Sequence, residues 1–426
     1  MNRRDLLKYT GAAGALALLA PRLGTAGGVR HATGTPRRLL MVMCQGGWDT
    51  TFAIDPKEQG PKVDVPAGTL KRYGSLDIHT NNAAGGWPSV DTFFTKYAPI
   101  TAVVRGISVA SVSHNECVTR MSTGTRDESN ADMGAIVAND LGNDLPLPYL
   151  ILGDTAFTGP YAVSAGRVGA TNQIIALLDP AQAYPTGSAT PFRPTGAEEA
   201  ILAKFANASV TRARATRGSS GYNKRRLDDY LSGIERGKKL RTVRDGFGAR
   251  GRTLTLGSQV DLALGALEQD VSQAVMLNTR LQWDTHDNND ADQAMFHQTT
   301  YAGLTRLIDQ LATRPGRAAG TKMIDDTVVV CFSEFARTPR RNIRGGKDHW
   351  PVTSALVMGA GIRGGRAYGA TTADIQGQPI GFATGNPSAT GKTLTSQHFV
   401  GGVLAACGVD AGQHLADPEV FAPYRA

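Results

Sequence analysis

Cysteine is scarce in this sequence, and it carries neither a paired-cysteine metal motif nor a dinucleotide fingerprint. Its four cysteines lie far apart and form no C-x-x-C motif, so neither a zinc knuckle nor a disulfide framework is predicted. Cys44 and Cys331 lie in apolar runs and are predicted to be buried thiols. The glycine-rich stretches 345–346 and 361–365 follow no dinucleotide-binding pattern and predict tight turns.

Long apolar runs are also missing beyond the amino terminus, so no stable transmembrane segment is predicted in the mature chain. The run Tyr9–Ala20 is shorter than the roughly 20 residues that span a bilayer. It follows the pair Arg3-Arg4, and the small residues 24–26 offer a cleavage site. This pattern predicts a twin-arginine signal peptide over residues 1–26. No cysteine follows the cleavage site, which argues against a lipoprotein.

The leader predicts a periplasmic or extracellular protein whose partner during export is the twin-arginine translocase. Residues 27–426 then form the mature protein, which is long enough for one large α/β domain. The alternatives for the leader are an ordinary Sec signal peptide and an uncleaved anchor.

The positive charge is local. The formal net charge is +8, of which the leader contributes +3, and residues 211–252 hold thirteen Lys and Arg against four Asp and Glu. The surrounding segment 208–256 is rich in Arg, Gly and Ser, and we predict a basic insertion or mobile segment with helical pieces around 226–240. Tyr222 and Phe247 stand among these arginines, but no recognition fold accompanies them, and no nucleic-acid partner is expected.

The apolar pattern predicts an α/β protein. Three short, continuously apolar runs are typical of strands buried on both faces, as in a parallel sheet covered by helices. These runs are 38–44, 327–332 and 354–359. Helical periodicity marks 197–207, 260–281 and 295–311. We therefore expect a three-layer sandwich with a mostly parallel central sheet and ligand chemistry at the carboxyl ends of its strands.

Acidic residues and histidines gather at the ends of these strands. The groups are Asp49, His114 to Glu116, Asp284 to Asp287, Glu334, and Asp348-His349. Carboxylates and imidazoles bind divalent metals, and a parallel sheet would bring the groups together at one edge. One or two ions are predicted, with zinc, manganese, iron and calcium not distinguished. The alternative for any single Asp–His pair is a buried histidine satisfied by a carboxylate.

Several motifs, in order along nearly the whole mature chain, resemble a bacterial family exported by the twin-arginine pathway. They are Gln45–Asp49, Trp283–His286, Ser333–Pro339 with Lys347–Pro351, Gly361–Gly365 and Gly369–Thr371. The family is a domain of unknown function, number 1501. It is similar in turn to the alkaline phosphatase and sulfatase superfamily, whose members hydrolyse phosphate or sulfate esters at a one- or two-metal site. The resemblance implies an alkaline phosphatase-like fold.

The resemblance also implies a set of ligands. Asp49 matches the superfamily's first metal-binding Asp, and Glu334 stands where the Asp of its Asp-His-Gly is found, although Phe335 replaces the His. Asp284 and His286 resemble the Asp and His of the other metal. His349 resembles the last metal-binding His.

The nucleophile matches least well. The segment 114–124 has the Thr-Gly ending of the sulfatase motif, and counting back places His114 where the nucleophile should be. Ser113 and Thr119 are nearby hydroxyls, while Cys117 is outside the formylglycine modification motif. His114 is therefore predicted to act as a metal ligand, with water attacking, or as a base.

Arg337 is the residue predicted to hold an anionic group, as arginine does with phosphate and sulfate. Its alternative is a surface arginine in a loop. The first functional hypothesis is an exported metal-dependent hydrolase acting on an anionic small-molecule or glycan ester. The second is a non-catalytic exported binding protein on the same fold.

Overall fold

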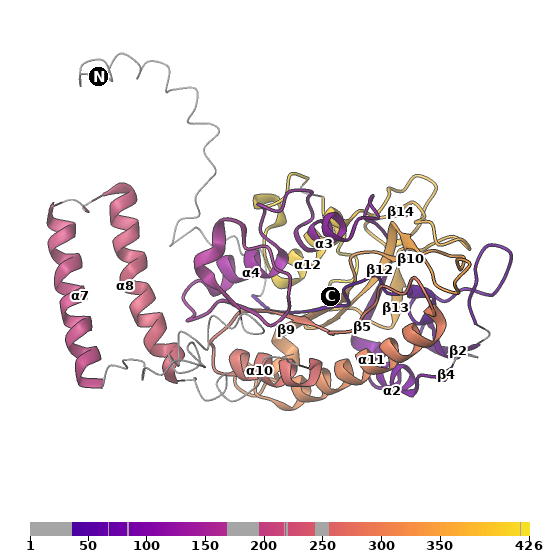
Figure 1. Cartoon of the computed structure of the whole chain (residues 1–426), viewed down its shortest axis with the longest axis horizontal. Helices are drawn as coiled ribbons and strands as arrows, with labels where there is room; N and C mark the ends of the chain where they lie inside the picture. Colours follow the sequence, from indigo (N-terminus) through magenta and orange to yellow (C-terminus); the bar gives the residue numbers. More distant parts are fainter. Residues whose placement is uncertain are drawn as a thin grey trace, which may run out of the picture.

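The chain folds around one eight-stranded sheet covered by helices on both faces (Figure 1). The structure is a computed structural model that describes residues 36–66, 68–82, 85–167, 196–216, 218, 220–242, 255–417 and 419–426. The predicted signal peptide lies outside the described residues.

The central sheet is parallel except for one strand. Its order is β13-β5-β12-β9-β1-β8-β6-β7. The strands are β1 (Arg38–Met43), β5 (Thr101–Ser108), β6 (Tyr149–Ile151), β7 (Ala165–Arg167), β8 (Ala274–Asn278), β9 (Thr327–Phe332), β12 (Val352–Gly359) and β13 (Arg366–Tyr368). Only β12 runs against its neighbours β5 and β9. The predicted mostly parallel sheet is confirmed.

Alternating side chains of β1 enter two separate cores. Leu40 and Val42 pack into one core, with the helices α2 (Pro88–Tyr97), α10 (Leu256–Glu268) and α11 (Asn289–Thr313). Leu39 and Met41 pack into the other, with α3 (His114–Thr123), α4 (Met133–Gly142) and α12 (Ser396–Cys407). Burial on both faces explains why this strand reads as a continuous apolar run. The predicted three-layer sandwich is confirmed.

Smaller elements surround this core. The short strands are β2 (Gly68–Tyr73), β3 (Leu76–Asn82), β4 (Gly85–Gly86), β10 (Ala336–Arg337), β11 (His349–Trp350), β14 (Ile380–Gly381) and β15 (Asn386–Pro387). The 3₁₀ turns are Thr50–Phe52, Ala98–Ile100, Gly159–Ser164, Met323–Asp326 and Ala411–Gln413. Side-chain caps define several starts: Asp132 caps α4 by accepting from the amide of Ala135, and Thr395 caps α12.

Two long helices form a hairpin that stands away from the sheet (Figure 1). They are α7 (Gly196–Thr216) and α8 (Gly221–Thr242). The hairpin reaches the body near the end of α8, where Arg236 donates to the carbonyl of Asn143 and Leu240 is buried. The described part of the predicted insertion 208–256 is therefore largely helical. Residues 243–254 lie outside the described residues, and whether the segment is an inserted one stays a prediction.

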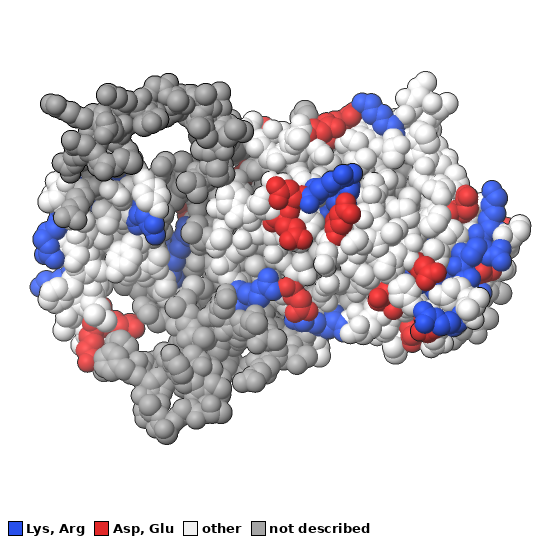
Figure 2. Space-filling view, turned by 45° about the horizontal axis from the view of Figure 1, so that its top comes forward, with Lys and Arg blue, Asp and Glu red and all other residues white. Residues whose placement is uncertain are grey.

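The charges of this hairpin are mixed in sign. Asp228 pairs with both Arg214 and Lys224. On the face shown in Figure 2, basic and acidic side chains occur in small groups side by side rather than as one basic patch.

Two secondary-structure predictions need correction. The predicted helix 260–281 is helix α10 only as far as Glu268, and Ala274–Asn278 is the buried strand β8. A short apolar run buried on both sides has no periodicity that separates a strand from a helix. The predicted strand 354–359 exists, as part of β12, but it is antiparallel to its neighbours.

The cysteine predictions hold. All four cysteines are free and buried, and the sulfurs of Cys44 and Cys331 lie 3.8 Å apart across β1 and β9. Within the described ranges, no helix has the length and apolar character needed to cross a membrane.

Candidate metal centre

The predicted ligands meet at the carboxyl edge of the sheet. Asp284 follows β8, Glu334 follows β9, and His114 begins α3 shortly after β5. His349 precedes β12, and because β12 is antiparallel, its amino end lies at this same edge. The reversed strand therefore brings His349 to this edge.

A tight glycine turn lets the loop after β1 approach this edge. Gly46 has φ of +122°, and a Cβ there would lie 2.6 Å from the amide nitrogen of Asp284. Any side chain at Gly46 would push the two loops apart.

Three histidines and one aspartate converge. The Asp284 carboxylate lies 3.1 Å from His286 Nε2, 3.2 Å from His349 Nε2 and 3.4 Å from His114 Nε2. The Nε2 atoms of His286 and His349 are 3.0 Å apart. One donor atom from each of His114, Asp284 and His349 fits within a span of 4.8 Å.

The far nitrogen of each ring is held by an acceptor. His114 Nδ1 lies 2.9 Å from Glu334, His286 Nδ1 lies 2.9 Å from Asp348, and His349 Nδ1 lies 2.7 Å from the carbonyl of Val112. A neutral imidazole that donates from Nδ1 has its lone pair on Nε2. In the neutral tautomer that donates from Nδ1 to these partners, the Nε2 lone pair of each ring lies beside the Asp284 carboxylate. Such an arrangement is repulsive unless a proton or a cation lies between the rings.

Glu334 supports this cluster from behind. Its side chain is fully buried, accepts from the amide of Gly46 at 2.8 Å and from the Ser333 hydroxyl at 3.0 Å, and holds His114. The hydrogen bond with Glu334 raises the pKa of His114 above its usual value, against the effect of burial. Glu334 therefore lies behind His114. Its hydrogen bonds reach His114 but not Asp284, His286 or His349.

Asp49 lies apart from the histidines. Its Oδ2 is 2.7 Å from Lys347 Nζ and 3.1 Å from Asn289 Nδ2, while its Oδ1 accepts from the amide and hydroxyl of Thr51. Burial alone would raise the pKa of Asp49, but the charge of Lys347 and these hydrogen bonds lower it. Both carboxylate oxygens already have two partners each, so little capacity remains for a metal.

Arg337 is fully buried. It donates to the carbonyls of Gly46, Gly47 and Lys347 and, at 2.7 Å, to the carboxylate of Asp284. Its guanidinium therefore contacts the cluster through Asp284, and its exposed fraction of zero leaves no face open to a solute.

The cluster is open on its other side. The exposed side-chain fractions are 41% for Asp284, 33% for His114 and His286, and 21% for His349. The four converging groups are therefore accessible to solvent. Three imidazoles with a carboxylate, each imidazole fixed by a second partner, is a donor set that suits Zn²⁺ and related divalent ions.

A second group of possible ligands fits a metal less well. His398, Asp417 and Glu419 lie close together near the start of α12. His398 Nδ1 accepts from the amide of Thr395, so its Nε2 carries the proton and donates toward Asp417. Lys392 already pairs with Glu419.

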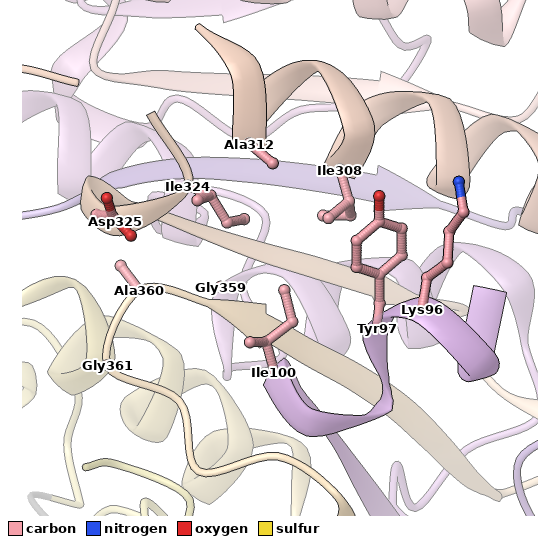
Figure 3. Close-up of a pocket in the computed structure, with 10 residues that line it drawn as sticks. All are labelled: Lys96, Tyr97, Ile100, Ile308, Ala312, Ile324, Asp325, Gly359, Ala360 and Gly361. Atoms are coloured by element: carbon pink, nitrogen blue, oxygen red, sulfur yellow. The ribbon is translucent and has the colours of Figure 1, made fainter. Parts of the chain in front are cut away.

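A pocket of about 410 Å³ lies at the opposite edge of the sheet (Figure 3). It is lined by Ile100, Ile308 and Ile324 and by Gly359 at the end of β12. The cluster of His114, Asp284, His286 and His349 and this pocket are therefore on different sides of the molecule.

Three supporting residues were not assigned a role from the sequence. Asp348 lies beside His349 in one of the motifs that resemble the family, and only the folded structure reveals its contact with His286. Lys347 precedes it, and nothing in the sequence distinguishes a buried lysine from a surface one. Val112 contributes only a carbonyl, which no sequence pattern reveals.

Comparison with known proteins identifies a family and a leader. The family model described as "Protein of unknown function (DUF1501)" matches residues 36–410. The model of the twin-arginine translocation pathway signal sequence matches residues 1–20, which confirms the predicted export by that pathway. No curated protein matches the chain.

Solved structures resemble the chain loosely. A crystal structure of Ps i-CgsB aligns with a TM-score of 0.40 and 9% identity, over 92% of this chain and 76% of that one. The lipoteichoic acid synthase LtaP from Listeria monocytogenes aligns with a TM-score of 0.40 and 9% identity, over 97% and 82%. A phosphonate monoester hydrolase of Agrobacterium radiobacter aligns with a TM-score of 0.31 and 13% identity, over 88% and 74%. At these TM-scores the alignments assign no activity to this chain.

Proposed function

The chain belongs to the DUF1501 family, and from that premise we propose that it is an exported metal-dependent hydrolase of phosphate or sulfate esters. Its ligands are His114, Asp284, His286 and His349, which hold one divalent ion. The observation that carries the proposal is the convergence of three imidazole Nε2 atoms on one carboxylate.

The hydrogen-bond partners of the three rings favour a metal site over a cluster of histidines with a purely structural role. A buried histidine satisfied by a carboxylate uses one ring nitrogen on that partner and keeps the other in the core. Here the carboxylate or carbonyl partner sits behind each ring, and the front nitrogens of His286 and His349 approach to 3.0 Å. Carboxylate–histidine pairs of this kind orient ligands and raise their basicity.

A divalent ion at this site would polarise an ester oxygen and make a bound water more acidic. The surrounding side chains would position the ligands and admit the substrate. Glu334 fixes His114, Arg337 fixes Asp284, and the exposed side of the cluster admits an anionic small-molecule or glycan ester. Because its donors are spent on backbone carbonyls and Asp284, we propose that Arg337 is a positioning residue.

The nucleophile is proposed to be water. Burial raises the pKa of Cys117 to about 11, so its thiol stays protonated at neutral pH. The Thr119 hydroxyl is buried and donates to the carbonyl of Asn115. Ser113 is exposed at the start of α3 and is the remaining hydroxyl beside His114.

The experiment measures metal content and hydrolysis of aryl phosphate and aryl sulfate esters by the mature exported protein. We expect turnover with a divalent metal, and a loss of at least about 100-fold in His286→Ala and His349→Ala. The control is His398→Gln, which alters a histidine outside the cluster and should keep both metal and activity. Metal binding without turnover, together with affinity for anionic glycans, would favour the non-catalytic binding protein instead.

A further inference from the structure

Helix α11 presents a row of buried polar side chains to the loops beside the proposed metal site. Asn289, Gln293 and His297 are spaced four residues apart, so they lie on one face of the helix, and all three are fully buried. Polar groups that are shut off from water destabilise a fold unless they find hydrogen-bond partners. Their partners therefore show what this face of α11 holds in place.

Gln293 joins the loop after β1 to the loop after β8. Its Oε1 accepts from the backbone amide of Asp49 at 2.7 Å, and its Nε2 lies 3.2 Å from the carbonyl oxygen of Trp283 and 3.1 Å from the Thr285 hydroxyl. A backbone amide only donates and a carbonyl only accepts, so these partners distinguish the oxygen of the side chain from its nitrogen. The Gln293 amide is thus held in one orientation between the two loops.

The contacts from α11 meet at the hydroxyl of Thr285. This residue lies between the proposed ligands Asp284 and His286 and is 4% exposed. Its Oγ1 donates to Asn289 Oδ1 at 2.7 Å and accepts from Gln293 Nε2 at 3.1 Å. Because a hydroxyl has a single proton to donate, the contact with Asn289 uses its whole donor capacity.

The backbone of Thr285 is held as well. Its amide donates to the carbonyl of Trp283 at 3.0 Å, and its carbonyl accepts from the amide of Lys347 at 3.0 Å. Thr285 is therefore bound through its side chain to α11 and through its backbone to the segment that precedes His349. Asp284 and His286 flank this point on either side.

We propose that Thr285 is a positioning residue for the metal site, anchored to α11 by Asn289 and Gln293. This inference rests on the proposed function, because that proposal assigns Asp284 and His286 as ligands. The Asp284 carboxylate lies 3.1 Å from His286 Nε2, so a shift of the Thr285 backbone displaces both donor atoms. Contacts that orient metal ligands typically change metal affinity by about 10–100-fold when they are lost.

A purely structural role for this network makes a different prediction. Loss of the Thr285 hydroxyl leaves Asn289 Oδ1 and Gln293 Nε2 without that partner, which destabilises the fold whether or not the chain holds metal. A positioning role changes the arrangement of the ligands around the ion in addition. Measurements of bound Co²⁺ and of the unfolding of the metal-free protein, made on the same variants, separate the two.

Thr285→Val and Thr285→Ser form a matched pair, because valine has the shape of threonine without its hydroxyl and serine keeps the hydroxyl. We expect Thr285→Val to lower Co²⁺ affinity of the mature protein by about 10–100-fold and to alter the visible absorption of the bound ion, which reports ligand geometry. Thr285→Ser should restore both. The control Thr299→Val removes an exposed hydroxyl of α11, which donates to the carbonyl of Met295, and should change neither.

The outcomes separate this inference from the proposed function. A wild-type protein that binds no Co²⁺ would overturn the metal site and the positioning role with it. Co²⁺ bound by wild type and by Thr285→Val with the same affinity and spectrum would overturn the positioning role alone, even if the metal-free variant unfolds at lower urea. If Thr285→Val does not fold, as judged by circular dichroism, Gln293→Met removes one anchor at similar side-chain length and carries the same expectation.

Discussion

Asp49 and Lys347 form an ion pair that is shut off from water. Their side chains are exposed by 1% and 0%, and their charged atoms lie 2.7 Å apart. The pair ties the loop after β1 to the segment that carries Asp348 and His349. Removing one partner of a buried pair leaves a charge without a counter-charge, at a cost of about 3–5 kcal/mol.

We predict that Asp49→Asn destabilises the fold by about 3–5 kcal/mol in urea unfolding. The control Asp77→Asn breaks the exposed pair with Arg72 and should cost less than about 1 kcal/mol. Equal losses in the two variants would show that the buried pair has no special role.

The pH dependence of this loss follows from the lowered pKa of Asp49. A carboxyl whose folded pKa lies below its unfolded value of about 3.9 stabilises the fold fully above that unfolded value. The stabilisation disappears as pH falls through the folded pKa. The stability gap between wild type and Asp49→Asn should therefore narrow in acid, and a gap that widens would contradict this assignment.

Glu334 contacts His114, one of the four proposed metal ligands. We predict that Glu334→Gln lowers metal affinity by about 10–100-fold, because His114 loses its charged partner. Competition with a chromogenic chelator measures it. Glu116→Gln, on an exposed side chain of α3 paired with Arg120, is the control and should bind metal as tightly as wild type.

At the scale of elements, the loop between β10 and β11 fixes the geometry of the cluster. The Asn342 side chain donates to the backbone carbonyl of His286. The backbone amide of Lys347 donates to the backbone carbonyl of Thr285. A Cβ at Gly346 would overlap the His286 carbonyl group. The loop is thus packed against the backbone of a ligand and holds both His286 and Asp348 in place.

Two neighbouring glycines in this loop offer a matched test. Gly346→Ala should displace His286 and lower metal affinity by at least about tenfold. Gly345 has φ of +74° and open space around its Cα, so Gly345→Asn should keep wild-type affinity. Similar affinities in both variants would show that the loop does not position the ligand.

The sequence predicted this edge of the sheet better than the roles of its residues. Apolar runs located β1, β9 and β12, and Glu334 follows β9 as expected. Asp284 and His286 instead follow β8, which no apolar run identified, and His349 precedes β12. The position of a residue at the end of a strand does not determine which neighbouring side chain it contacts. Asp49 pairs with Lys347 and Arg337 turns inward to carbonyls, because buried charges take whatever partners the loops supply.

Strand β8 shows a second limit. Its residues Ala274–Asn278 are buried on both sides and follow the apolar helix α10 after only the short segment 269–273. Local periodicity could not separate the two, although β8 pairs with β1 in the centre of the sheet and delivers Asp284. For such a segment, tertiary contacts determine whether it forms a strand or a helix.

Across the whole molecule, the proposed ligands span residues 114 to 349 and meet only after β5, β8, β9 and β12 have paired. Export of folded proteins by the twin-arginine pathway agrees with a site that needs the finished sheet. Metal binding to the folded state alone stabilises it, so we predict that chelation lowers the melting temperature by several degrees. Restoring the ion should reverse the shift, and an unchanged melting temperature would count against the site.

Metal analysis of the mature protein, purified after export by its own leader, tests whether the cluster of His114, Asp284, His286 and His349 holds a divalent ion. We predict about one equivalent of a divalent transition metal per chain, lost in His286→Ala and His349→Ala and kept in His398→Gln. Less than about a tenth of an equivalent in wild type, from metal-replete cells, would contradict it.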